Sequence, residues 1–133
     1  MEKRIFTYPQ AIALLEEVRA ITRFHSDRME SVRSQSPARP GTRRHHKVNE
    51  WCNRIIEEWA AKVSALGALP KGLWTVDFDS GEGFYYCWVL DEPMLGFVHD
   101  YAEGFSGRRP LRKEGEHAPE DDRDLPPGDG PAT

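Results

Sequence analysis

The chain has 133 residues, enough for one domain around a single hydrophobic core. Its net charge of −4 comes from residues 112–133, because residues 1–111 hold 15 acidic and 15 basic side chains. This neutrality argues against a dedicated nucleic-acid-binding protein. No apolar run reaches the ~18–20 residues that span a bilayer, and Cys52 and Cys87 form no disulfide or zinc motif. We therefore expect a cytoplasmic protein without a membrane segment.

A capping signal and a helical period predict a long first helix from about residue 8. Thr7 and Gln10 fit a T-x-x-Q capping box, and Pro9 stands in the first turn, where its missing N–H costs nothing. Beyond them one apolar face recurs every three or four residues and ends near Ser34. Its members are Ala11, Leu14, Leu15, Val18, Ile21, His25, Met29 and Val32.

A second helix follows a short break. Two prolines and a glycine between residues 36 and 41 cannot continue a helix. The helical period resumes at Val48 and runs to Leu66, with Gly67 as the C-terminal cap and Pro70 as the stop. Because the connection is short, we expect an antiparallel helical hairpin over residues 8–67.

From Gly72 the hydrophobic period changes from 3.6 to 2, which predicts a three-stranded antiparallel β-meander over residues 72–101. One face of this sheet is strongly apolar, and the helical hairpin is its predicted cover. The expected fold is therefore α+β, with the long antiparallel hairpin packed on one face of the meander. A loop over residues 102–111 closes this domain of residues 1–111, and residues 112–133 are predicted to be a disordered acidic tail.

The strand register decides which face carries the histidine of the third strand. Pairing Phe78 with Phe84, and Leu90 with Leu95, brings the apolar positions of all three strands onto the helix-facing side. In this register His99 lies on the inner face, whereas Asp77 and Cys87 lie on the outer face. A single β-bulge would reverse His99.

The chain resembles the uncharacterised bacterial family called domain of unknown function 2203. The resemblance covers roughly residues 4–111, and its C-terminal motif G-F-x-G-R-R-P-L is the most specific part. It implies a bacterial intracellular protein of no established activity, and it draws attention to Cys87, Glu92, His99, Arg108 and Arg109. The matching residues are Arg4, Phe6, Thr7, Ala11, Leu14, Leu15, Asp77, Phe78, Cys87, Trp88, Glu92, His99, Gly104, Phe105 and 107–111.

Two candidate sites emerge. His99 with His25, Cys52 and Glu92 offers imidazole, thiolate and carboxylate ligands for zinc or ferrous iron. The alternative is that the histidines are hydrogen-bonded core residues and that Glu92 belongs to a turn.

Arg108 and Arg109, after a glycine-rich loop, form the second candidate site and could hold a small anionic ligand. The alternative is that one of these arginines pairs with Asp77 or Asp100 and fixes the chain end to the sheet, with Phe105 filling a pocket. Cys87 lacks an evident activating base and is interpreted as a small buried hydrophobe.

A basic segment, Arg43-Arg44-His45-His46-Lys47 with Arg39 nearby, marks the expected tip of the hairpin. It could touch nucleic acid or an anionic lipid surface. A solvated helix start is the alternative, although positive charge there opposes the helix dipole.

The leading functional hypothesis is a non-enzymatic interaction module that forms a homodimer. Two helices over three strands should leave aromatic and apolar surface exposed for a second copy. The residues proposed for that surface are Phe24, Trp51, Trp59, Leu73, Tyr85 and Val89. The alternatives are a divalent-metal protein or small metalloenzyme centred on His99, and an anion-binding regulator that uses Arg108 and Arg109.

Overall fold

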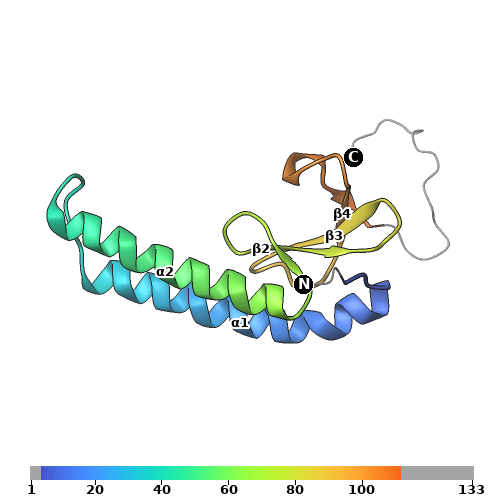
Figure 1. The fold of residues 1–133 in the computed structure, drawn as a ribbon, viewed down its shortest axis with the longest axis horizontal. Coiled ribbons are helices and arrows are strands. Elements are labelled where there is room, and N and C mark those ends of the chain that lie inside the picture. The colour runs from blue at the N-terminus through green and yellow to red at the C-terminus, as the bar shows by residue number, and fades with distance from the viewer. Residues whose placement is uncertain (1–3, 112–133) are drawn as a thin grey trace.

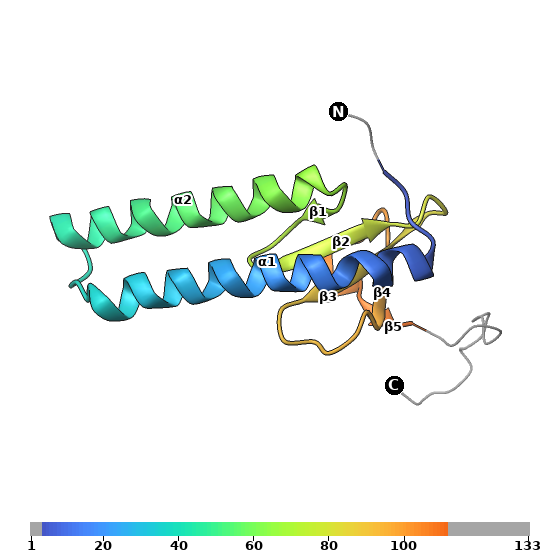
Figure 2. The same ribbon diagram turned by 90° about the horizontal axis from the view of Figure 1, so that it is seen from below.

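A computed structural model describes residues 4–111 in two layers, a helical hairpin and a five-stranded antiparallel sheet. The sheet covers the half of the hairpin near its open end, and the closed tip of the hairpin extends well beyond the sheet (Figures 1 and 2). Neither helix could cross a bilayer, given its length and polarity. The tail predicted over 112–133 lies outside the described residues.

Helix α1 spans Tyr8–Gln35, and its predicted capping box is confirmed. The Gln10 backbone N–H donates to the Thr7 hydroxyl at 3.2 Å, and the Thr7 backbone N–H donates to the Gln10 side-chain oxygen at 2.9 Å. These two bonds satisfy N–H groups that a helix start leaves free. The buried stripe of this helix contains Ala11, Leu15, Val18, Thr22, His25 and Met29.

Helix α2 spans Arg43–Ala65 and begins before its first apolar residue, because Thr42 caps it through the backbone N–H of His45. Its Trp59 is almost fully buried, which corrects the prediction that this ring is exposed. The Trp59 indole N–H donates to the Thr22 hydroxyl of α1 at 2.9 Å, and the ring packs edge-on against Trp74. The hairpin is therefore joined internally by a buried hydrogen bond as well as by apolar packing.

The sheet has the order β1-β2-β3-β4-β5, with every neighbouring pair antiparallel. The predicted meander is confirmed as β2 (Thr75–Asp79), β3 (Phe84–Val89) and β4 (Phe97–Asp100). Two edge strands of two residues each, β1 (Leu69–Pro70) and β5 (Arg109–Pro110), were not predicted. Strands this short, each containing a proline, have no period that a sequence could display.

The register between β3 and β4 differs by one residue from the predicted register. His99 pairs with Tyr85, and Val98 pairs with Tyr86. The reason is the position of Leu95, which is buried in the core from the connection before β4 instead of pairing with Leu90 inside the sheet. Because a one-residue slip exchanges the two faces, the prediction that His99 faces the hairpin is wrong.

The inner face of the sheet therefore carries the core, and the outer face carries polar residues. Val76, Phe78, Tyr86, Trp88 and Val98 pack with the hairpin in one buried cluster. The outer face follows the alternate positions, which include Asp77, Cys87 and His99. A 3-10 turn, η1 (Phe105–Gly107), leads from β4 into β5 across this outer side.

Candidate metal centre on the outer face of the sheet

Asp77, Cys87 and His99 come together on the sheet face that the hairpin does not cover. Asp77 in β2 lies directly opposite Cys87 in β3, and His99 in β4 lies one diagonal step away. One ligand atom from each residue can be chosen so that all three lie within 4.8 Å of one another. Within residues 4–111 this is the one place where three His, Cys, Asp or Glu side chains converge in this way.

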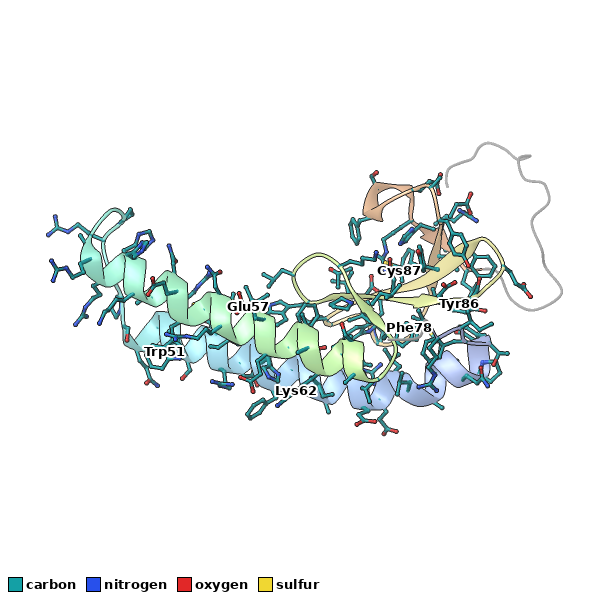
Figure 3. The ribbon with its side chains drawn as sticks, viewed as in Figure 1. Trp51, Glu57, Lys62, Phe78, Tyr86 and Cys87 are labelled. Carbon is teal, nitrogen blue, oxygen red and sulfur yellow. The ribbon has the colours of Figure 1, made fainter. Side chains whose placement is uncertain are left out.

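All three side chains are buried although they occupy the outer face. The exposed fractions of the residues are 1% for Asp77, 1% for Cys87 and 4% for His99. Figure 3 shows Cys87 on the side of the sheet away from the hairpin, with Phe78 and Tyr86 on the hairpin side. The burial therefore comes from neighbouring strands, from rings on the outer face and from the closing segment, not from a second layer of helices.

Both ring nitrogens of His99 face oxygen acceptors, and the tautomer of the ring decides which nitrogen donates. The Nε2 atom of His99 lies 2.9 Å from Oδ2 of Asp77, and Nδ1 lies 3.2 Å from the backbone oxygen of Asp100. If Nδ1 carries the hydrogen for that carbonyl, a neutral ring presents the lone pair of Nε2 to the carboxylate. In that tautomer a second ring proton or a metal ion must lie between the two atoms, whereas in the other tautomer Nε2–H donates directly to Asp77.

The remaining polar atoms of the trio are also incompletely satisfied. The Oδ1 atom of Asp77 is buried without a hydrogen-bond partner of good geometry among the described residues, although the Cys87 thiol interacts with the Asp77 carboxylate. Burial, followed by the charge of Asp77, raises the pKa of the Cys87 thiol to about 12, while the guanidinium of Arg108 acts in the opposite direction. The thiol is therefore protonated at neutral pH unless another cation replaces its proton.

A cleft of about 270 Å³ opens above the trio. Asp77, Cys87 and His99 lie among its lining residues, together with the aromatic rings of Tyr85 and Tyr101. Further lining comes from Lys71, Gly72, Thr75, Glu103, Gly104 and Phe105. The trio is thus accessible to a small ligand from one side although its residues are buried.

The other predicted metal ligands do not join His99. His25 lies in the hairpin, where Nδ1 contacts the Ile21 carbonyl at 2.7 Å and Nε2 lies 3.5 Å from the Glu58 carboxylate. Cys52 is buried in the hairpin with Met29 and Ile55.

Glu92 belongs to the turn after β3, as the alternative interpretation expected. Its carboxylate accepts a hydrogen bond from the Val89 backbone N–H at 3.0 Å and one from Arg108 at 2.7 Å. It is therefore already engaged by the chain and offers no free carboxylate to His99.

The two arginines of the closing segment contact carboxylates of the same chain. Arg109 donates to Asp100 at 2.9 Å, as the alternative to anion binding expected. Arg108 donates to Glu92 and to the Cys87 backbone oxygen, and its guanidinium lies against the ring of Phe97 with a centroid distance of 4.1 Å. These contacts favour a structural role for both arginines.

Phe105 does not fill a pocket, because it is 57% exposed at the edge of the cleft. The expectation of a buried anchor there is therefore wrong. Its ring instead lies against the Arg108 guanidinium, at a centroid distance of 4.8 Å.

Sequence reasoning missed Asp77 and Cys87 as partners of His99. The signal that could have found them was the shared parity of Asp77 and Cys87, which the alternation of β2 and β3 already indicates. Only the register of β4 separated His99 from them.

Comparisons with known proteins give a family but no activity. No curated protein and no solved structure matches the chain. The model of the family described as "Uncharacterized conserved protein (DUF2203)" matches residues 4–111, which include all of the candidate centre. The chain therefore belongs to this uncharacterised conserved family.

Proposed function

We propose that this protein binds a divalent transition-metal ion, with zinc as the best fit, through Asp77, Cys87 and His99. The observation that carries the proposal is the buried convergence of an imidazole, a carboxylate and a thiol, in which Nε2 of His99 lies 2.9 Å from Oδ2 of Asp77. Carboxylate oxygen, thiolate sulfur and imidazole nitrogen are all zinc ligands.

The distances suit a tetrahedral ion after a small adjustment. Zinc–nitrogen and zinc–oxygen bonds of about 2.0–2.2 Å place the two ligand atoms about 3.3 Å apart across a tetrahedral angle. The distance of 2.9 Å between His99 and Asp77 needs to open by only a few tenths of an ångström. A thiolate ligand, with a zinc–sulfur bond of about 2.3 Å, would lie about 3.6 Å from each of the others, inside the observed limit of 4.8 Å.

The chemistry of the surroundings also supports the proposal. Nδ1 of His99 lies 3.2 Å from the Asp100 carbonyl, and a hydrogen bond from Nδ1–H to this oxygen would fix the ring and direct the lone pair of Nε2 toward the proposed ion. One thiolate and one carboxylate would neutralise the two charges of the ion. The Arg108 guanidinium opposes the rise in the pKa of Cys87 that burial and Asp77 cause, and so favours the thiolate that such a site requires.

The number of ligands favours a site with an open position. Three protein ligands leave the fourth position of zinc free for water or a small ligand, which is the arrangement of catalytic rather than structural zinc sites. That position would face the cleft of about 270 Å³. A metal ion there would polarise a bound water or carbonyl group.

A metal-independent cysteine nucleophile is less well supported. Such a nucleophile needs a lowered pKa and a base within hydrogen-bond reach. The pKa of Cys87 is raised to about 12, and Nε2 of His99 is directed at Asp77.

The test is metal binding by the full chain, purified without an affinity tag and stripped with a chelator. Zinc is titrated against a chromophoric competitor, and Co²⁺ is used as a spectroscopic probe for thiolate ligation. We expect one ion per chain and a sulfur-to-cobalt charge-transfer band. Asp77→Asn, Cys87→Ser and His99→Gln should each weaken binding by more than the ~10–100-fold that the loss of a supporting hydrogen bond costs.

The chain supplies matched controls from the hairpin. Cys52→Ser and His25→Gln remove a buried thiol and a buried imidazole away from the proposed centre, and they should leave affinity and the cobalt spectrum unchanged. Substoichiometric zinc in the wild type, or a cobalt band that survives Cys87→Ser and disappears in Cys52→Ser, would refute this assignment.

Self-association remains a second candidate, and a different observation favours it. Phe24 on α1 is 56% exposed, Trp51 on α2 is 49% exposed and Leu73 before β2 is 51% exposed. Large apolar side chains of this kind commonly mark a contact surface. Sedimentation equilibrium of the wild type should return twice the chain mass of 15.2 kDa. The double variant Phe24→Ser with Trp51→Ser should return the monomer mass. A wild-type monomer at tens of micromolar would contradict self-association.

A further inference from the structure

The tip of the helical hairpin, defined here as residues 31–49, is a concentrated positive patch. It contains five Arg or Lys residues and no Asp or Glu, and Glu30 and Glu50 bound it on either side. The cations are Arg33, Arg39, Arg43, Arg44 and Lys47. Figure 3 shows nitrogen-bearing side chains projecting outward around this end of the hairpin.

These five cations have no side-chain partner among the described residues. All five are exposed, and within residues 4–111 none of them forms an ion pair or a side-chain hydrogen bond. Nearer the sheet, by contrast, Arg28 and Lys62 both contact Glu58, and Arg23 contacts Asp91. The charge of the tip is therefore available to a partner.

The position of the patch disfavours the folded state unless an anion is present. Arg43 and Arg44 are the first two residues of α2, and the first turn of that helix contains no acidic residue. A cation at a helix N-terminus opposes the helix dipole by about 0.3–1 kcal/mol. Phosphate groups at the tip would neutralise the arginines and would also meet the positive end of the dipole.

We propose that the tip of the hairpin binds the phosphate backbone of nucleic acid without reading its sequence. Four of the five cations are arginines, whose planar fork holds phosphate oxygens in two places. Helix α1 has 28 residues and is therefore about 42 Å long. The tip consequently projects beyond the sheet, where a bulky polyanion reaches it without contacting the rest of the protein (Figure 1).

A nucleic acid fits the tip better than an anionic membrane does. Proteins that dock on lipid through a basic segment usually insert large apolar side chains beside it. Between residues 31 and 49 none of the exposed side chains is a large apolar one, and a single exposed ring, Trp51, lies one helical turn beyond Lys47. One ring beside the tip is less than the apolar face that membrane-binding helices insert.

The net charge of the described residues does not reveal this local positive patch. Residues 4–111 hold 14 acidic and 14 basic side chains, so their net charge argues against nucleic-acid binding. Affinity for phosphates depends on the local arrangement of cations rather than on the sum over the chain. The proposal does not depend on the metal centre, which lies on the sheet at the other end of the molecule.

The test is fluorescence anisotropy with labelled 20-base-pair duplex DNA and RNA of unrelated sequences, between 50 and 200 mM NaCl. Vesicles containing phosphatidylserine are tested in parallel by co-sedimentation. The tip variant is Arg39→Gln, Arg43→Gln, Arg44→Gln and Lys47→Gln. The charge-matched control is Arg19→Gln, Arg23→Gln, Arg54→Gln and Lys62→Gln, and circular dichroism checks that both variants are folded.

We expect wild-type binding whose logarithm falls with the logarithm of salt concentration at a slope of roughly −4, from about five phosphate contacts. The tip variant should lose at least about tenfold in affinity at 50 mM NaCl and most of the slope, while the control keeps both. Equal weakening by the two variants, binding to vesicles alone, or no binding by the folded wild type would each overturn the proposal.

Discussion

Arg108 gives the sharpest prediction about what holds the outer face of the sheet together. Its guanidinium contacts the Glu92 carboxylate at 2.7 Å and the Cys87 carbonyl at 3.1 Å, and its Nε atom is buried without a hydrogen-bond partner. The guanidinium also lies against the rings of Phe97 and Phe105. Arg108→Met, which keeps much of the stem but removes the charge, should therefore destabilise the protein.

The magnitude follows from burial. The Arg108 side chain is 12% exposed and that of Glu92 is 23% exposed, so their ion pair is partly screened by solvent. Removing one partner of a fully buried pair costs about 3–5 kcal/mol, whereas exposed pairs contribute about 0.2–1 kcal/mol. We expect Arg108→Met to lower the free energy of unfolding by about 2–3 kcal/mol, between these limits.

A double-mutant cycle separates the ion pair from packing. Glu92→Gln keeps an oxygen for the Val89 N–H and removes the charge, and urea unfolding of the four proteins gives the coupling energy. We expect about 1–2 kcal/mol for this pair. The exposed pair of Arg109 with Asp100, whose side chains are 49% and 53% exposed, is the matched control and should give less than about 0.5 kcal/mol.

The reasoning fails if both cycles give the same small coupling. The structural role of Arg108 would then have no energetic support. If, in addition, phosphate raised the melting temperature of the wild type but not of Arg108→Met, the anion-binding hypothesis for this arginine would be correct instead.

Three further measurements address the centre, the hairpin and the first helix cap. Because burial and Asp77 raise the pKa of Cys87 to about 12, the folded state holds this proton more tightly than the unfolded state. With a chelator present, the stability of the wild type relative to Cys87→Ala should therefore be constant below about pH 9 and decline as pH rises toward 12; a difference that increases over that range contradicts the direction of the shift. Thr22→Val leaves the buried Trp59 indole N–H without an acceptor and should cost about 1–3 kcal/mol in urea unfolding, so a neutral result would mean that this bond contributes nothing. Thr7→Ala should cost about 1 kcal/mol through loss of the capping box, and thermal unfolding of Thr7→Ser provides the control.

The local elements could be predicted from the sequence because each has a local signal. The Thr7 cap, the proline break after α1 and the change of period at Gly72 are all properties of neighbouring residues. Strands β1 and β5 lacked such a signal, since they form only by pairing with β2 and β4.

The candidate site could be predicted only in part, because it depends on a non-local register. The sequence identified His99 as a candidate ligand. The side of the sheet on which His99 lies, however, depends on the length of the connection between β3 and β4. Leu95 lies in that connection with its side chain buried in the core, and the Tyr8 hydroxyl of α1 donates to the Leu95 carbonyl at 2.8 Å. This contact joins residues 87 positions apart, and no local period could reveal it. Once the register is known, the partners of His99 follow from strand alternation alone.

The composition of the outer face is itself an argument for a ligand. A buried cluster of carboxylate, thiol and imidazole, even with a hydrogen bond between His99 and Asp77, stabilises a fold no better than well-packed apolar residues of the same size. The inner face of the same strands shows that this chain can fill such positions with Val76, Phe78 and Trp88. On the outer face the equivalent buried positions instead hold acidic, thiol and imidazole groups beneath an accessible cleft. A metal ion would satisfy all three groups at once, and the proposed metal site would therefore account for the cost of burying them.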